Sequence, residues 1–182
     1  MSVKELFLRI TGHLDRAGIA YMVVGSFASS YYGAVRSTKD IDIVIEADAS
    51  QIRSLVTVLS DEFYAELGAA LDALASRSMF NLIDNATGWK IDLIMPKQTP
   101  YNRAAFLRRR PVRIQEVPLF VATAEDVIVS KLEWARMSES KRQIQDVARV
   151  LQLQTEILDH SYLDRWIQEL GLEAEWEEAR KS

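Results

Sequence analysis

The sequence predicts a mixed α/β fold of the α+β type, in which helices flank a mixed sheet and a helical tail forms the C-terminal end. Before residue 123, short apolar runs rich in β-branched residues alternate with amphipathic segments, whereas every periodic segment after it has helical spacing. The 182 residues, 48% of them hydrophobic, suffice for one globular domain with a small appendage. We therefore expect an α/β domain over residues 1–122 and a helical region packed on it over residues 123–182.

Each element of the α/β part has a local signal. Ser2 and Glu5 have the spacing of a capping box, which begins a first helix that ends near Gly18. Apolar runs between turn residues predict strands at residues 19–24, 41–46, 79–83, 89–95, 112–115 and 118–121. Periods of 3.6 residues predict further helices at residues 27–32, 49–59, 67–76 and 101–109.

The helical part begins at a second cap signal, in which Thr123 is followed three residues later by Asp126. The pattern then predicts helices at residues 123–137, 140–153, 162–170 and 173–180. No internal repeat and no low-complexity linker separates this part from the first. We therefore expect the two parts to pack as one unit.

Composition limits the kinds of site that the chain can build. It has no cysteine and two distant histidines, His13 and His160, so we expect any bound metal to be a hard cation held by carboxylate oxygens. Without a signal-peptide core or a long apolar run, it is expected to be cytoplasmic and to have no membrane partner. The net charge of -4 disfavours a broad grip on nucleic acid, but residues 97–115, with six basic and no acidic side chains, can meet a phosphate-rich ligand.

Asp40 and Asp42 stand one residue apart where the strand predicted at residues 41–46 begins. Because side chains alternate along a strand, both carboxylates point to one face, about 7 Å apart at Cα, and the intervening isoleucines point to the other. Two carboxylates at this spacing can converge on one divalent cation or bracket two of them. The alternative is a turn aspartate followed by one that faces water.

Asp92 lies within another predicted strand, between the apolar residues Ile91 and Leu93. Carboxylates in a sheet repel one another and lose hydration, so a cation or hydrogen-bond donors must balance them. Together with Asp40 and Asp42, Asp92 makes a candidate two-metal site for phosphoryl-type transfer. Taken alone, an aspartate within a strand is more often an edge or strand-end residue that faces water.

Gly25 and Ser26 interrupt the chain at a predicted strand-to-helix junction. A glycine there lets backbone amides approach an anion, and a serine adds a hydroxyl group. Gly-Ser is also a common turn. Its place fifteen residues before the Asp-x-Asp motif nevertheless puts a candidate phosphate cradle next to the candidate metal site.

These motifs together resemble a known family. A Gly-Ser turn, Asp-x-Asp on the next strand and a third carboxylate on a later strand are similar to the nucleotidyltransferase fold of the DNA polymerase β superfamily. The wider match resembles the abortive-infection-type toxin branch and related small bacterial nucleotidyltransferases. It covers residues 25–42, 80–83, 90–92 and 123–132, followed by Arg142 and Asp146.

The resemblance implies a nucleotidyltransferase-like mixed sheet and a role for each motif. Asp40, Asp42 and Asp92 would hold Mg²⁺, with the phosphates of an NTP bridging the metals, and Asp92 would also act as general base on the acceptor hydroxyl. Gly25 and Ser26 would hold the triphosphate.

Three basic residues are further candidates for nucleotide binding. Arg36 and Lys39 lie just before the aspartates, where they either neutralise phosphate charge or belong to a solvated loop. Lys131 lies in an apolar helical segment, where it either reaches a phosphate, as the resemblance implies, or extends its ammonium group to solvent.

The sequence thus predicts a Mg²⁺-dependent nucleotidyltransferase. It would move a nucleoside monophosphate from an NTP, such as ATP, to a hydroxyl on RNA (tRNA included), a protein or a small molecule, and release pyrophosphate. One alternative is a catalytically silent module that binds a nucleotide or a partner protein. Another is one half of a toxin–antitoxin pair.

Overall fold

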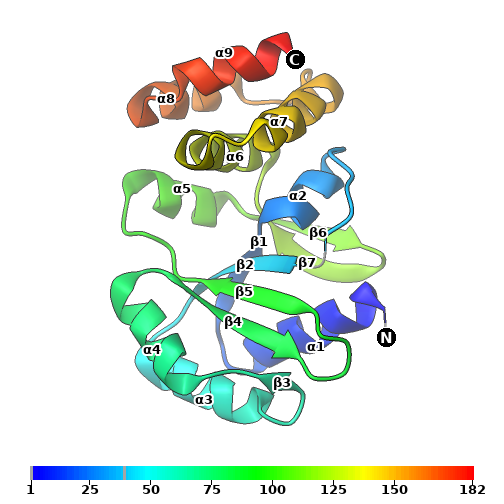
Figure 1. The fold of residues 1–182 in the computed structure, drawn as a ribbon, viewed down its shortest axis with the longest axis vertical. Coiled ribbons are helices and arrows are strands. Elements are labelled where there is room, and N and C mark those ends of the chain that lie inside the picture. The colour runs from blue at the N-terminus through cyan, green and yellow to red at the C-terminus, as the bar shows by residue number, and fades with distance from the viewer. Residues whose placement is uncertain (1, 39) are drawn as a thin grey trace. The chain divides into compact units, whose positions relative to one another are not determined.

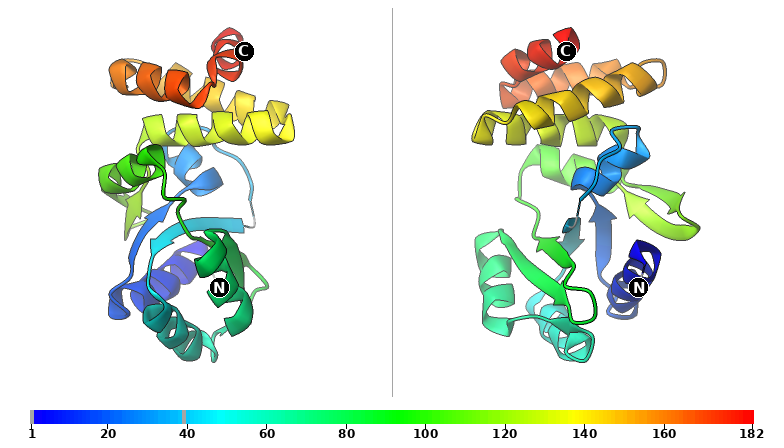
Figure 2. Two further views of the ribbon diagram at one scale, coloured as in Figure 1. Left: turned by 90° about the vertical axis from the view of Figure 1, so that its left-hand side faces the viewer. Right: turned by 45° about the vertical axis from the view of Figure 1, so that its right-hand side comes forward.

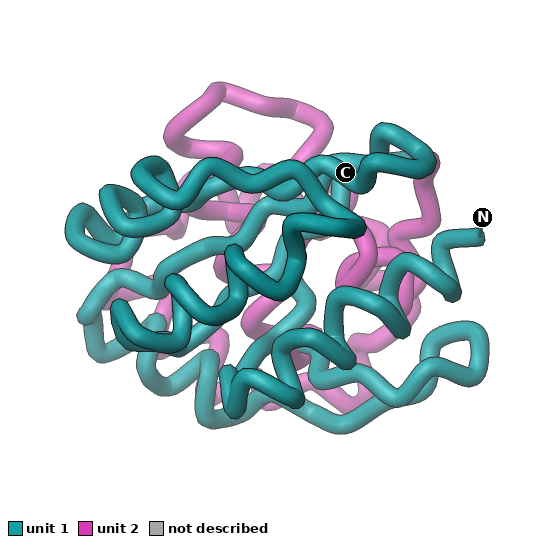
Figure 3. Tube along the Cα trace, turned by 90° about the horizontal axis from the view of Figure 1, so that it is seen from below, with its two compact units in different colours: residues 1–24, 38–121 teal, residues 25–37, 122–182 magenta. Residues whose placement is uncertain are grey.

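The computed structural model describes residues 2–38 and 40–182, which form seven strands and nine helices (Figure 1). They cluster into two compact units, one of residues 1–24 and 38–121 and one of residues 25–37 and 122–182 (Figure 3). Residues 25–37, which the sequence analysis placed with the α/β domain, therefore group with the C-terminal helices. No helix within the described residues is both long and apolar enough to cross a membrane.

The first unit contains a mixed seven-stranded sheet of order β3-β4-β5-β2-β1-β7-β6. The pairs β2–β5 and β1–β7 are parallel, and the other neighbouring strands are antiparallel. This arrangement confirms the predicted mixed sheet, in which β4 and β5 pair as an antiparallel hairpin. The strands are β1 (Ala20–Val23), β2 (Asp40–Glu46), β3 (Phe63–Tyr64), β4 (Met79–Asp84), β5 (Lys90–Ile94), β6 (Arg110–Ile114) and β7 (Val117–Val121).

Helices α1, α3 and α4 lie together on one side of this sheet (Figures 1 and 2). The predicted capping box begins α1, since the Glu5 amide donates to Ser2 and the Glu5 carboxylate accepts from the Ser2 amide. Helices α3 and α4 have the predicted bounds. The helices of this unit are α1 (Val3–Arg16), α3 (Ala49–Leu59), α4 (Leu67–Ser76) and α5 (Pro100–Arg108).

Strand β2 separates an apolar face from a polar one. Ile41, Ile43 and Ile45 are completely buried, whereas Asp40 is exposed and Asp42 is half-buried. The alternation predicted from the sequence is therefore confirmed. The isoleucines fix the strand in the core, and the aspartates consequently share the opposite face.

The second unit is helical, and its first helix comes from residues far away in the sequence. The Tyr32 hydroxyl donates to the Ala122 carbonyl at 2.9 Å, which fastens the end of α2 to the start of the C-terminal helices. Gly33 has φ of +111°, and a Cβ atom there would collide with Leu153. The helices are α2 (Gly25–Tyr31), α6 (Ala124–Ser138), α7 (Lys141–Gln154), α8 (His160–Leu170) and α9 (Glu173–Lys181).

Candidate active site

Asp42 and Asp92 lie directly opposite each other on neighbouring parallel strands. In the register of β2 and β5, Asp42 pairs with Asp92, and Asp40 pairs with Lys90. Paired residues on adjacent strands point to the same face of a sheet, so all four side chains share the face opposite the buried isoleucines. One strand pair thus gathers the three carboxylates of Asp40, Asp42 and Asp92, which we call the carboxylate group.

The members of the carboxylate group differ in their exposure to solvent. Asp40 is exposed and Asp42 half-buried, whereas only 6% of the Asp92 surface is exposed. A carboxylate that is removed from water depends on nearby donors or cations to remain charged. Asp92 is therefore the member that most needs partners within the fold.

Asn81 and Lys90 supply those partners. The Asn81 amide nitrogen Nδ2, opposite Asp92 on β4, donates to Asp92 Oδ1 at 2.5 Å. The Lys90 ammonium lies 3.1 Å from Asp92 Oδ2. The hydrogen bond to Asp92, and then the charges of Asp92, Asp40 and Asp42, raise the pKa of Lys90 above its ordinary value, although partial burial opposes this. Lys90 is thus the positive centre of the carboxylate group.

Sequence reasoning missed both partners of Asp92. Lys90 had a usable signal, since a residue two positions from Asp92 on a strand must share its face. Asn81 had none, because the register that places it opposite Asp92 depends on how β4 and β5 pair.

The donor chemistry of the carboxylate group fits the cation that the sequence implies, because Mg²⁺ prefers hard oxygen ligands. Among residues 2–38 and 40–182, no three His, Cys, Asp or Glu side chains are grouped so as to hold a metal ion. Within the described residues, the Lys90 ammonium is a positive charge next to Asp92.

Three of the predicted nucleotide-binding residues meet in the second unit around Asp146. The Arg36 guanidinium donates through Nη2 to the Ser26 hydroxyl, and its Nε lies 3.3 Å from Asp146 Oδ2. Lys131 Nζ lies 2.7 Å from the same oxygen and donates to Gln143 Oε1 at 2.9 Å. Two cations therefore converge on one carboxylate beside a hydroxyl group. We call Ser26, Arg36, Lys131 and Asp146 the basic cluster.

Much of the basic cluster is buried, with Lys131 only 4% and Asp146 only 1% exposed. The interpretation of Lys131 as extending to solvent is therefore wrong, because its ammonium group is held inside by Asp146. Sequence reasoning did not assign Asp146 a role. The available signal was an acid that lies between apolar residues, such as Ile144 and Val147, in the helix predicted at residues 140–153.

Gly25 is the first residue after the chain passes from the first unit to the second. Gly25, with φ of +62°, begins α2 in the left-handed region that favours glycine. The amide of Val24, the residue before Gly25, donates to the Asp42 carbonyl at 2.9 Å. This hydrogen bond holds the chain beside β2 immediately before α2 begins. Lys39 lies outside the described residues. The carboxylate group belongs to the first unit and the basic cluster to the second.

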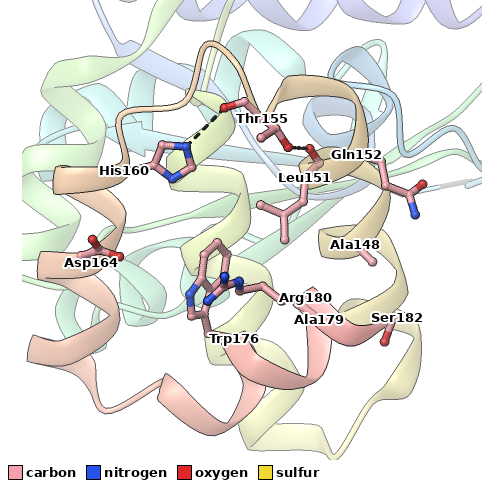
Figure 4. A pocket seen from close by; sticks show the side chains of 10 residues that line it. All are labelled: Ala148, Leu151, Gln152, Thr155, His160, Asp164, Trp176, Ala179, Arg180 and Ser182. Atoms are coloured by element: carbon pink, nitrogen blue, oxygen red, sulfur yellow. Dashed lines mark hydrogen bonds between the residues drawn. The ribbon is translucent and has the colours of Figure 1, made fainter.

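A cavity of about 620 Å³ lies among α7, α8 and α9 (Figure 4). Its lining combines the apolar side chains of Leu151 and Trp176 with the polar ones of His160, Asp164 and Arg180. Neither the carboxylate group nor the basic cluster contributes a lining residue. The cavity is therefore separate from the predicted site residues.

Several solved structures share this fold at low sequence identity. One is ANT(2'')-Ia in complex with adenylyl-2''-tobramycin, which is 12% identical to this chain with a TM-score of 0.56. The alignment covers 95% of this chain and 98% of the ANT(2'')-Ia chain. Lincomycin-bound LnuA, a lincosamide antibiotic adenylyltransferase, is 13% identical with a TM-score of 0.53, covering 82% and 96%. An antigenic nucleotidyltransferase-like protein from Paracoccidioides brasiliensis is 16% identical with a TM-score of 0.56, covering 94% and 90%. These likenesses confirm the predicted nucleotidyltransferase-like fold.

Sequence comparison identifies the family. No curated protein matches the chain. One family model, described as a nucleotidyltransferase of unknown function (DUF6036), matches residues 1–180 and so covers both units. The chain therefore belongs to this family of nucleotidyltransferases.

Proposed function

We propose that the protein transfers a nucleoside monophosphate from an NTP to an acceptor hydroxyl, with release of pyrophosphate and a requirement for Mg²⁺. The main support is the register of β2 and β5, which gathers Asp40, Asp42 and Asp92 on one face of the sheet. Three carboxylates would repel a bare triphosphate, so this arrangement is useful to a nucleotide enzyme when the carboxylates hold a divalent cation.

In this proposal the three aspartates hold the cation through oxygen donors from two strands. Bound Mg²⁺ would neutralise phosphate charge and make the α-phosphorus more electrophilic. The acceptor oxygen bonds to the α-phosphorus, and the bond from that phosphorus to the pyrophosphate oxygen breaks. The hydroxyl proton passes to Asp92, which acts as general base.

We assign triphosphate binding to the basic cluster together with Gly25 and Lys39. The guanidinium of Arg36 and the ammonium of Lys131 are charged donors of the kind that bind phosphate oxygens, and the Ser26 hydroxyl lies beside Arg36. Within this assignment, Asp146 does not touch the nucleotide. It orients both cations through the oxygen that they share.

For the acceptor, we propose to begin with small molecules that carry hydroxyl groups. The support is that ANT(2'')-Ia and LnuA, which share the fold, have been solved with an adenylylated antibiotic and with lincomycin respectively. RNA, including tRNA, and protein hydroxyls complete the panel of acceptors.

The deciding experiment incubates the protein with Mg²⁺, cell extract and each of the four NTPs in turn. An α-phosphate label should appear in an acceptor fraction, and a γ-phosphate label should leave as pyrophosphate. Asp42→Asn should lower transfer by about two orders of magnitude or more, since it removes a charged oxygen from the group that neutralises the developing charge.

Glu46→Gln is the matched control, because Glu46 is an exposed acid on the same face of β2. It should leave transfer unchanged, which would tie the effect to the position of Asp42 and not to charge on the strand. Binding of an NTP without label transfer or pyrophosphate release in any fraction would contradict the proposal and favour a silent nucleotide-binding module.

A further inference from the structure

Lys90 lies where a cation is needed on the carboxylate face. It is opposite Asp40 in the strand register and two residues before Asp92 on the same strand. Its ammonium lies 3.1 Å from Asp92 Oδ2, while the other oxygen, Oδ1, accepts from Asn81. Both carboxylate oxygens of Asp92 therefore already have partners.

Charge balance explains why a lysine occupies this position. Three carboxylates on one face repel one another, and Asp92 has lost most of its hydration. Asn81 offers a hydrogen bond but no charge, so it cannot offset the repulsion. The single positive charge of Lys90 can, and its effect reaches Asp40 and Asp42 as well as Asp92.

The two partners of this pair differ in their freedom to move. The Lys90 side chain is 42% exposed, whereas the Asp92 side chain is 8% exposed. A lysine side chain with four methylene groups can turn its ammonium into water, but the carboxylate is fixed between strands. When the pair separates, it is Lys90 that leaves.

We propose that Lys90 is a built-in counter-cation that stabilises the carboxylate group in the ion-free protein and is displaced from Asp92 when a divalent cation binds. The inference rests on the proposed function, because it takes the carboxylate group to be the cation site. Two positive charges beside one oxygen of the buried Asp92 carboxylate repel each other strongly, so the divalent ion and the Lys90 ammonium compete for that oxygen. The cation affinity is then set partly by Lys90 as well as by the aspartates.

The test measures Mn²⁺ binding to the nucleotide-free protein by electron paramagnetic resonance of free Mn²⁺. Lys90→Met keeps the length of the side chain and removes its charge, and we expect it to bind Mn²⁺ about ten times more tightly than the wild type. Lys90→Arg keeps the charge and should remain close to the wild type. Lys4→Met, on the exposed surface of α1, controls for the change in net charge.

Thermal unfolding supplies a second measurement that does not depend on catalysis. Without divalent ions, Lys90→Met should unfold at a lower temperature than the wild type, because the carboxylate group has lost its counter-charge. Saturating Mn²⁺ should remove most of this difference. Lys90→Gln, which retains a hydrogen-bond donor for Asp92, serves if Lys90→Met does not fold, and the same tightening of Mn²⁺ binding is expected.

The outcomes separate this inference from the proposed function. If the wild type binds Mn²⁺ and the uncharged variants bind it equally or more weakly, Lys90 does not compete and the inference is overturned while the cation site stands. If neither the wild type nor the variants bind Mn²⁺, both the inference and the cation site fall. If Lys90→Met and Lys90→Gln bind Mn²⁺ more tightly than the wild type while Lys90→Arg and Lys4→Met do not, both the inference and the cation site are supported.

Discussion

The Lys131 ammonium and the Asp146 carboxylate form a buried ion pair, with 2.7 Å between Nζ and Oδ2. The same oxygen lies 3.3 Å from Arg36 Nε, so two cations depend on one acid. A buried charge that loses its counter-charge is far more costly than the intact pair is stabilising. This asymmetry leads to the first prediction.

We expect Asp146→Asn to destabilise the protein more than Lys131→Met does. In Asp146→Asn, Lys131 and Arg36 both lose the negative charge that they share, whereas in Lys131→Met the acid keeps Arg36 as its counter-charge. The expected loss in free energy of unfolding is about 3–5 kcal/mol for Asp146→Asn and roughly half of that for Lys131→Met. Urea denaturation at neutral pH measures both. Equal losses, or a larger one for Lys131→Met, would contradict the shared-acid arrangement.

A second set of ion pairs links α1 to residues near the edge of the sheet. Arg9 contacts the fully buried Asp84 at 2.5 Å and Glu62 at 3.1 Å. Burial by itself would raise the pKa of Asp84, but hydrogen bonds from Thr87 and Arg9 lower it below its ordinary value. The pKa of Glu62 is lowered first by its hydrogen bond with His13 and then by Arg9.

These lowered pKa values predict how stability depends on pH. A carboxyl group whose pKa is lower in the folded state stabilises the fold above its unfolded pKa, and this stabilisation disappears as pH falls through the folded pKa. We therefore expect Arg9→Met to be less stable at neutral pH but to lose less stability between about pH 5 and pH 2, because both carboxyls then titrate nearer their unfolded values.

Urea midpoints at a series of pH values test this prediction. Arg165→Met, which breaks an exposed pair with Glu169, should leave the pH dependence unchanged and serves as the control. If Arg9→Met lost stability with falling pH as steeply as the wild type does, Arg9 would not be what lowers the pKa values of Asp84 and Glu62.

Asn81 is expected to act on the cation through Asp92. Removing its amide in Asn81→Ala frees Asp92 to turn, and the loss of such an orienting hydrogen bond typically weakens a metal site about 10–100-fold. We expect a corresponding rise in the Mg²⁺ concentration that gives half-maximal pyrophosphate release. Ile83→Ala, on the same exposed face of β4, is the control. An unchanged Mg²⁺ requirement in Asn81→Ala would show that Asn81 does not orient Asp92 for cation binding.

Gly33 is expected to resist substitution for two separable reasons. Its φ of +111° strains any residue with a Cβ atom, and that atom would also meet Leu153. We expect Gly33→Ala to cost about 1–2 kcal/mol of stability. Adding Leu153→Ala to the Gly33→Ala protein should recover only part of the loss, because it relieves the overlap and not the backbone strain. Full recovery in urea denaturation would show that the overlap is the whole cost.

Local patterns predicted the elements that local chemistry determines. Helix α3 has the predicted bounds because Asp48 and Gln51 form a capping box and an apolar face follows them. The alternation along β2 was equally readable, because the buried isoleucines impose it. Strand β3 was not predicted, since two residues are too few to show a period.

The partners of the predicted site residues could not be read from such patterns. Alternation placed Lys90 on the same face as Asp92, but only the pairing of β2 with β5 places it opposite Asp40. Likewise, Lys131 and Asp146 lie on different helices, and their contact depends on how α6 and α7 pack. The narrower resemblance to toxin-type nucleotidyltransferases stays a prediction. The Gly-Ser turn and the three aspartates relate to nucleotide transfer in general, and they do not identify the partner protein of a toxin–antitoxin pair.

The division into units has a practical consequence for anyone who wishes to dissect the gene. The polypeptide passes from one unit to the other after residues 24, 37 and 121, so neither unit is encoded by one continuous stretch of the gene. A truncation after residue 121 would leave α2 and the buried Tyr32 without the helices against which they fold. Independent expression of the helical unit would instead need residues 25–37 to be fused to residues 122–182 through a designed linker.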